Sequence, residues 1–96
     1  MIEIETHPVP DNFRASAHID RAKYDTMYRR SIESPEKFWA EQADTFIDWY
    51  DRWDRVYEAD FARGRFAWFK GATLNASYNC IDRHLQTRGD QVAIIW

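Results

Sequence analysis

The sequence predicts an α+β fold that is mainly helical, with three helices, short extended pieces and a terminal strand. Three stretches place apolar residues three or four positions apart, which is the spacing of one face of a helix. Short runs rich in aromatic and β-branched residues lie between the second and third stretches and are typical of strands. Residues 92–96, VAIIW, form an unbroken apolar run, as expected of a strand with both faces covered.

The composition fits one small folded domain and excludes several classes of protein. The chain has 96 residues, 45% hydrophobic and 17% aromatic, so it can bury a modest core. Its net charge of −3 provides no large positive field, and we expect no nucleic-acid partner. Without a basic leader or an apolar stretch of spanning length, we expect a cytoplasmic protein and no membrane contact. The single cysteine, Cys80, fits a reducing compartment.

Residues 1–20 are expected to form an extended or poorly ordered lead-in, and residues 21–96 the folded segment. The lead-in contains Pro8 and Pro10 and shows no period. Asp20 is placed to cap a first helix of about 12 residues. The apolar face of this helix holds Tyr24, Met27, Tyr28 and Ile32.

The second helix has the clearest start signal in the chain. Ser34 is a suitable N-cap, and Pro35 suits the first helical position because its missing N–H is not needed there. An aromatic stripe at three-to-four spacing predicts that this helix runs to about Tyr50. The stripe from Trp39 to Trp53 is either a ligand-binding box or core packing, and its one-face spacing favours core packing.

Residues 48–65 form a charged connector between the second helix and the extended pieces. Arginines alternate there with acids and aromatics, which is one pattern of single-strand nucleic-acid binding. Five acidic residues against four arginines leave the segment at −1, so a solvated connector is favoured. Val56 and Tyr57 hint at a short strand, and residues 66–69 predict a second extended piece that ends in a turn at Gly71.

The third helix is predicted from Asn75, its N-cap, to about Gln86, with Tyr78, Ile81 and Leu85 on its buried side. Gly89 fits the left-handed residue just past a helix. Residues 92–96 then form the terminal strand, whose sheet we expect to lie beyond this chain. If the chain is isolated, such a strand favours self-association through its unpaired backbone groups.

Chemistry-bearing residues are few. Cys80 and His84 lie four apart on the third helix, as a thiol and its base require, and a metal site would add Asp82 or His18. We favour a structural role for both, since no second paired motif exists. The three glycines are isolated, so there is no phosphate-binding loop. We therefore assign no catalytic, cofactor-binding or metal-binding residue.

Several separated motifs resemble one family. They are FWAEQA at residues 38–43, WYDRWDRV at 49–56, LNASYNCIDRHL at 74–85 and RGDQVAIIW at 88–96. Together they resemble the N-terminal segment of acetyl-coenzyme A synthetase, an AMP-forming acetate–CoA ligase of the adenylate-forming superfamily. The resemblance covers about residues 24–96 and is collinear.

The resemblance implies a parent enzyme several times longer, which uses Mg-ATP to convert acetate to acetyl-AMP and then to acetyl-CoA. In this family the residues that bind ATP, magnesium, acetate and coenzyme A lie downstream of the matching segment. The chain is then an N-terminal packing segment, truncated before the catalytic domain and inactive alone, whose partner is the rest of the large domain. Two alternatives are an autonomous helical interaction module with an aromatic binding face, and a small thiol enzyme that uses Cys80 and His84.

Overall fold

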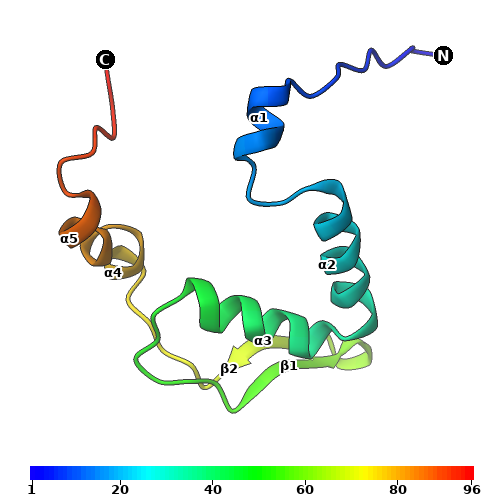
Figure 1. The fold of residues 1–96 in the computed structure, drawn as a ribbon. Helices are drawn as coiled ribbons and strands as arrows, with labels where there is room; N and C mark the ends of the chain where they lie inside the picture. Colours follow the sequence, from blue (N-terminus) through cyan, green and yellow to red (C-terminus); the bar gives the residue numbers. More distant parts are fainter. The chain divides into compact units, whose positions relative to one another are not determined.

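The computed structural model describes residues 1–96 and divides them into two compact units (Figure 1). The N-terminal unit is Met1–Ser34, and the C-terminal unit is Pro35–Trp96. The first contains helices only, and the second combines helices with a two-stranded antiparallel sheet. A mainly helical fold with short extended pieces, as the sequence predicts, is therefore confirmed.

The N-terminal unit contains α1 (Asp11–Ser16) and α2 (Arg21–Glu33). The predicted cap of α2 is confirmed, because the Asp20 carboxylate accepts a hydrogen bond of 2.7 Å from the Lys23 N–H. The sequence analysis missed α1, which lies inside the expected extended lead-in. This helix begins directly after Pro10, whose carbonyl accepts from the Arg14 N–H at 3.1 Å, and its six residues are too few to show a period.

The C-terminal unit begins with α3 (Pro35–Phe46), which starts at the predicted proline. The helix ends earlier than the predicted Tyr50. Beyond Phe46 the backbone is bound by distant side chains: the Asp48 N–H donates to the Asn79 side chain at 2.8 Å. The Trp49 indole also folds back and donates to the Ala43 carbonyl at 3.2 Å. These bonds replace the helical ones that the sequence pattern predicts.

The sheet is a hairpin of β1 (Arg55–Asp60) and β2 (Arg65–Lys70), with Tyr57 opposite Trp68. A 3₁₀ turn, Phe61–Arg63, joins the strands, and the Asp60 carboxylate caps it by accepting from the Arg63 N–H at 3.2 Å. The extended piece at residues 66–69 and the turn at Gly71, whose φ is +81°, are confirmed. The short strand that the sequence indicated at Val56 is present and is longer than expected, with six residues. Figure 1 shows α3 lying along this hairpin.

The predicted third helix is broken into α4 (Ala76–Cys80), a 3₁₀ turn (Asp82–His84) and α5 (Leu85–Arg88). Its cap is confirmed, since the Asn75 side chain accepts from the Tyr78 N–H at 3.0 Å. The break has a local cause: His84 Nε2 lies 3.1 Å from the Asn79 carbonyl, which an unbroken helix would use for its own ladder. The prediction that Gly89 adopts a left-handed conformation is wrong, because its φ is −59°.

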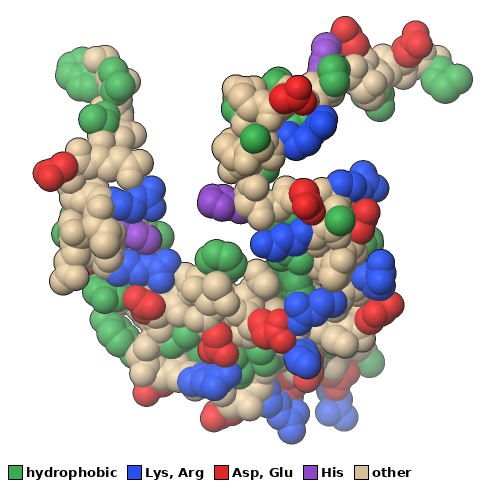
Figure 2. Space-filling view, viewed as in Figure 1, with side chains coloured by type: hydrophobic (Ala, Val, Ile, Leu, Met, Phe, Trp, Pro, Cys, Tyr) green, Lys and Arg blue, Asp and Glu red, His purple; other side chains and the backbone are tan.

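The terminal strand predicted at residues 92–96 does not form within this chain, and its pairing with a sheet beyond the chain stays a prediction. These residues belong to no helix or strand, and the only sheet in the structure has the order β1–β2. An apolar run becomes a strand only where another strand pairs with its backbone. Figure 2 shows hydrophobic side chains standing free at this end of the chain, and Ile95 and Trp96 are almost fully exposed.

Candidate functional site: an aromatic cluster and a polar clamp

Seven aromatic side chains of the C-terminal unit contact one another and form what we call the aromatic cluster. They come from α3, the connector and both strands. Neighbouring ring centroids lie 4.5 to 6.4 Å apart, the range in which aromatic pairs attract. The members are Phe38, Trp39, Trp49, Trp53, Tyr57, Trp68 and Phe69.

The aromatic cluster is packing rather than a ligand box, because its rings fill the space between them. Phe69 lies within 6.1 Å of Trp49, Trp53 and Trp68, measured between ring centroids. Its φ of +48° is unfavourable for a bulky residue and costs on the order of 1–2 kcal/mol. The three ring contacts of Phe69 hold it in this conformation. Phe38, at 6% exposure, is one of the two buried apolar residues, and Ala43 is the other.

A second feature, the polar clamp, joins α4 to the end of α3. The side-chain amide of Asn79 accepts from the Asp48 N–H at 2.8 Å and donates to the Asp48 carbonyl at 2.9 Å. It also donates to the Asn75 carbonyl at 2.9 Å. One side chain therefore satisfies both backbone groups of Asp48, as a neighbouring strand would.

Arg83 completes the polar clamp. Its guanidinium donates to the Phe46 carbonyl at 2.7 Å and lies 3.6 Å from the Asp48 carboxylate. The side chain is only 24% exposed, and a cation there is favourable because the carbonyl end of α3 carries partial negative charge. Neither the Arg83 contact nor the Asn79 contact is predicted from the sequence, because each joins residues more than 30 positions apart. The sequence signal for these contacts is the short polar motif at residues 74–85, which contains the Asn79 amide and the Arg83 guanidinium.

Cys80 and His84 line one hollow beside α5, but no hydrogen bond joins the thiol to the imidazole. Cys80 is an exposed free thiol. The His84 ring lies against the Asn79 carbonyl at 3.1 Å and the Arg83 guanidinium at 3.4 Å, so its contacts are those of the polar clamp. No three histidine, cysteine, aspartate or glutamate side chains converge as a set of metal ligands. The arrangement supports a structural role for His84.

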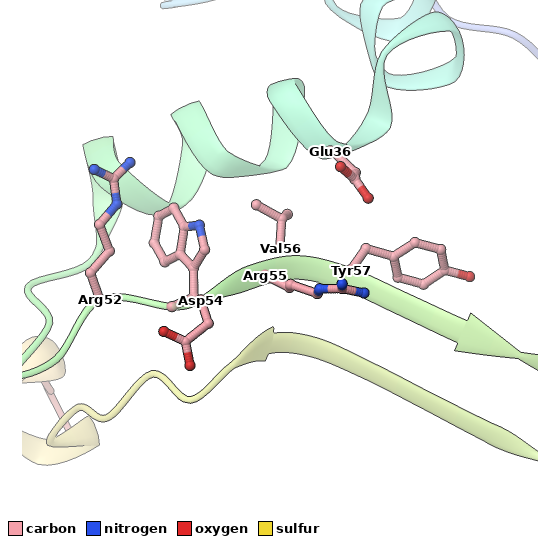
Figure 3. Close-up of a pocket in the computed structure, with 7 residues that line it drawn as sticks. Glu36, Arg52, Asp54, Arg55, Val56 and Tyr57 are labelled. Carbon is pink, nitrogen blue, oxygen red and sulfur yellow. The ribbon is translucent and has the colours of Figure 1, made fainter.

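A charged hollow of the C-terminal unit lies between α3 and β1 and has a volume of about 560 Å³ (Figure 3). In Figure 3, Val56 points towards α3, whereas Asp54 points to the other side of the strand. Arg52 is already engaged: it pairs with Asp44 at 2.8 Å and stacks 4.7 Å over the Trp53 ring. The charges in the wall balance, and the wall contains no serine, threonine, cysteine, lysine or histidine; the lining residues are Glu36, Arg52, Trp53, Asp54, Arg55, Val56 and Tyr57.

Two further ion pairs lie in the hairpin. Lys70 reaches across the hairpin to Glu58 at 2.8 Å, and this hydrogen-bonded ammonium holds the pKa of Glu58 below its ordinary 4.5. Arg63 lies 3.7 Å from Asp60. Positive charges that are matched by carboxylates do not make a track for a phosphate backbone. The connector is therefore a solvated, ion-paired segment.

Much apolar surface stays uncovered. In the C-terminal unit, Phe46, Phe66 and Ile81 are 62%, 71% and 60% exposed. Each of these side chains is also exposed when only its own unit is considered. None of the helices combines the length and the apolar composition that a membrane span requires. The exposed apolar side chains instead suit contact with more protein.

Comparison with known proteins gives this arrangement a family. A family model described as acetyl-coenzyme A synthetase N-terminus matches residues 24–80. The chain is 51% identical over 96 residues to the acetyl-coenzyme A synthetase of Alkalilimnicola ehrlichii. It is 50% identical to acetyl-coenzyme A synthetase 2 of Pseudomonas aeruginosa and 53% identical to the enzyme of Alcanivorax borkumensis, again over 96 residues. In each case all of the chain is covered, but only 15% of the relative. The chain therefore belongs to the acetyl-coenzyme A synthetase N-terminus family.

Proposed function

We propose that the chain is the N-terminal structural segment of an AMP-forming acetate–CoA ligase. Its relatives are named acetyl-coenzyme A synthetases, and the chain spans 15% of their length. The parent reaction is ATP plus acetate plus coenzyme A to acetyl-CoA, AMP and pyrophosphate, through acetyl-AMP. The segment packs on the large α/β domain of the parent and takes no part in the chemistry.

The observation that carries this proposal is the uncovered apolar surface. Only Phe38 and Ala43 are buried, although 45% of the residues are hydrophobic. A segment that is completed by more protein has this distribution of side chains, because its apolar residues face outwards until the partner covers them. Its polar side chains, Asn79 and Arg83 above all, are used to join its own elements.

The residues present do not fit ATP, magnesium or coenzyme A. The charged hollow offers no run of backbone N–H groups from a glycine-rich loop, and its two arginines are balanced by two carboxylates. We therefore place all three cofactors in the remainder of the parent and derive no step through them. The cytoplasmic location expected from the sequence stays a prediction.

An ATP–pyrophosphate exchange assay with acetate tests the proposal. The full-length enzyme that carries this segment should catalyse exchange, and the isolated 96 residues should not exceed background. The control is the same full-length enzyme assayed without acetate. Exchange by the isolated chain, or a full-length protein that ignores acetate, would contradict the proposal.

The alternative is an autonomous interaction module. It is favoured by one observation, namely that Trp39 and Trp68 of the aromatic cluster keep 44% of their surface exposed. This alternative requires that the chain work as a free monomer. Its test is whether the 96 residues occur in cells as a separate protein, which a size-resolved immunoblot against the segment measures.

A further inference from the structure

We propose that one face of α2, formed by Tyr24, Tyr28 and Ile32, docks onto the remainder of the parent enzyme. This inference rests on the proposed function and assigns the docking surface that it requires. The three residues are four apart, so their side chains lie along one side of the helix. They are 55%, 59% and 65% exposed, and the two tyrosine rings stack with centroids 6.2 Å apart. We call this surface the tyrosine face.

Within its own unit α2 has nothing to pack on. No residue of the N-terminal unit is buried. The helix has 13 residues, a length at which an isolated helix is marginal in water. Its Asp20 cap and the exposed pair of Arg21 with Asp25, 3.0 Å apart, add only modest support. A regular helix with an uncovered tyrosine face therefore needs a surface to dock on.

The occupant we infer is the rest of the same enzyme rather than a second copy of this segment. The chain covers 15% of its relatives' length, so most of the parent is available to cover the face. The family match begins at Tyr24 and so takes in the whole tyrosine face, while it leaves out α1. Three partly exposed side chains offer a few hundred Å², less than the roughly 800 Å² per partner of a specific dimer. A tethered surface needs less area, because the tether supplies a high effective concentration.

The tyrosine face also indicates the chemistry of its partner surface. A hollow of about 370 Å³ lies beside it, with Tyr28 and Ile32 in its wall. The rest of the wall is charged and is made by Asp25, Arg29 and Glu33. An apolar side chain of the partner fits this hollow, and hydrogen-bonding groups around it meet the charged rim.

Hydrogen–deuterium exchange on unmodified proteins tests this inference without any folding variant. Amides of residues 24–33 should exchange at least about tenfold more slowly in the full-length enzyme than in the free 96-residue chain. Equal rates in the two proteins would overturn the inference. Slow exchange in the free chain would also overturn the inference. This holds if the rate depends on concentration, as docking of a second copy requires, and equally if it does not.

Paired variants of the full-length enzyme identify the face. Tyr24→Ser with Tyr28→Ser should remove the protection of α2, whereas Ala22→Ser with Thr26→Ser, on the opposite face, should keep it. If the variant with Tyr24→Ser and Tyr28→Ser keeps the protection of α2, the assignment of the tyrosine face is wrong. If the full-length enzyme catalyses exchange with acetate but α2 is unprotected, only this inference fails. If the enzyme does not act on acetate, the proposed function fails.

Discussion

Replacing Asn79 by alanine removes the centre of the polar clamp. The variant loses the two hydrogen bonds to the backbone of Asp48, at 2.8 and 2.9 Å. It also loses a third, to the Asn75 carbonyl, which does not hold Asp48 and does not count towards its opening. Each bond to Asp48 contributes about 1 kcal/mol net, and alanine returns about 0.5 kcal/mol of helix propensity in α4. The expected loss is therefore about 1.5 kcal/mol, which is about tenfold in a local opening equilibrium.

The Asp48 amide is the direct reporter of this loss, because it donates to the Asn79 side chain. Hydrogen exchange followed by NMR should show that this amide exchanges about tenfold faster in Asn79→Ala. Asn79→Asp is the matched variant: it keeps an acceptor for the Asp48 N–H but has no amide donor for the Asp48 carbonyl. It should give an intermediate rate.

Asn12→Ala, at an exposed asparagine of α1, is the control and should leave the Asp48 amide unchanged. The reasoning is refuted if Asn79→Ala leaves the exchange rate of the Asp48 amide at its wild-type value. It is also refuted if Asn79→Ala and Asn12→Ala change that rate equally, because the clamp would then have no specific role.

Two further predictions concern the hairpin. The folded pKa of Glu58 lies below 4.5, because Lys70 donates to the ionised carboxylate; this pair therefore stabilises the hairpin above the unfolded pKa and is lost as pH falls through the folded value. In a carboxyl NMR titration, Lys70→Met should move the Glu58 midpoint back towards its ordinary value. Arg55→Met, the control, should move this midpoint less. Equal midpoints in wild type and Lys70→Met would contradict the pairing. Gly71→Ala should destabilise the C-terminal unit by about 1–2 kcal/mol in urea titrations of tryptophan fluorescence, because Gly71 has φ +81°; the Asp54 carboxylate, 2.6 Å from the new Cβ, can turn away and adds little. Gly64→Ala is its control, with φ +64° and open space around the new methyl group, and should lose about 1 kcal/mol; a much larger loss in Gly71→Ala than in Gly64→Ala would show that the Asp54 carboxylate does not turn away.

The sequence predicted those features whose causes are local. Asp20 and Asn75 bond to N–H groups three residues away, so the starts of α2 and α4 follow from the caps alone. The turn at Gly71 follows from a residue type that tolerates positive φ. The aromatic spacing likewise indicated packing, and the rings do contact one another.

Two of the features that sequence reasoning missed depend on distant parts of the chain. The end of α3 is set by Asn79 and Arg83, which lie 31 and 37 positions along the chain from the backbone groups they bind. No window of residues around Phe46 contains that information. The apolar run at residues 92–96 has strand composition, but pairing needs a neighbouring strand, and the structure provides none for it.

The motif LNASYNCIDRHL, which carries most of the resemblance, now has a physical role in this chain. Its Asn75 caps α4, its Asn79 and Arg83 bind the end of α3, and its His84 ring occupies the carbonyl that breaks the helix. Each of these four polar side chains contacts backbone of the C-terminal unit. The apolar residues show the opposite pattern, since Ile81 and Leu85 of the same motif are 60% and 57% exposed. A motif with internal polar contacts and outward apolar side chains joins its own elements and presents a surface to more protein, as the proposed packing role requires.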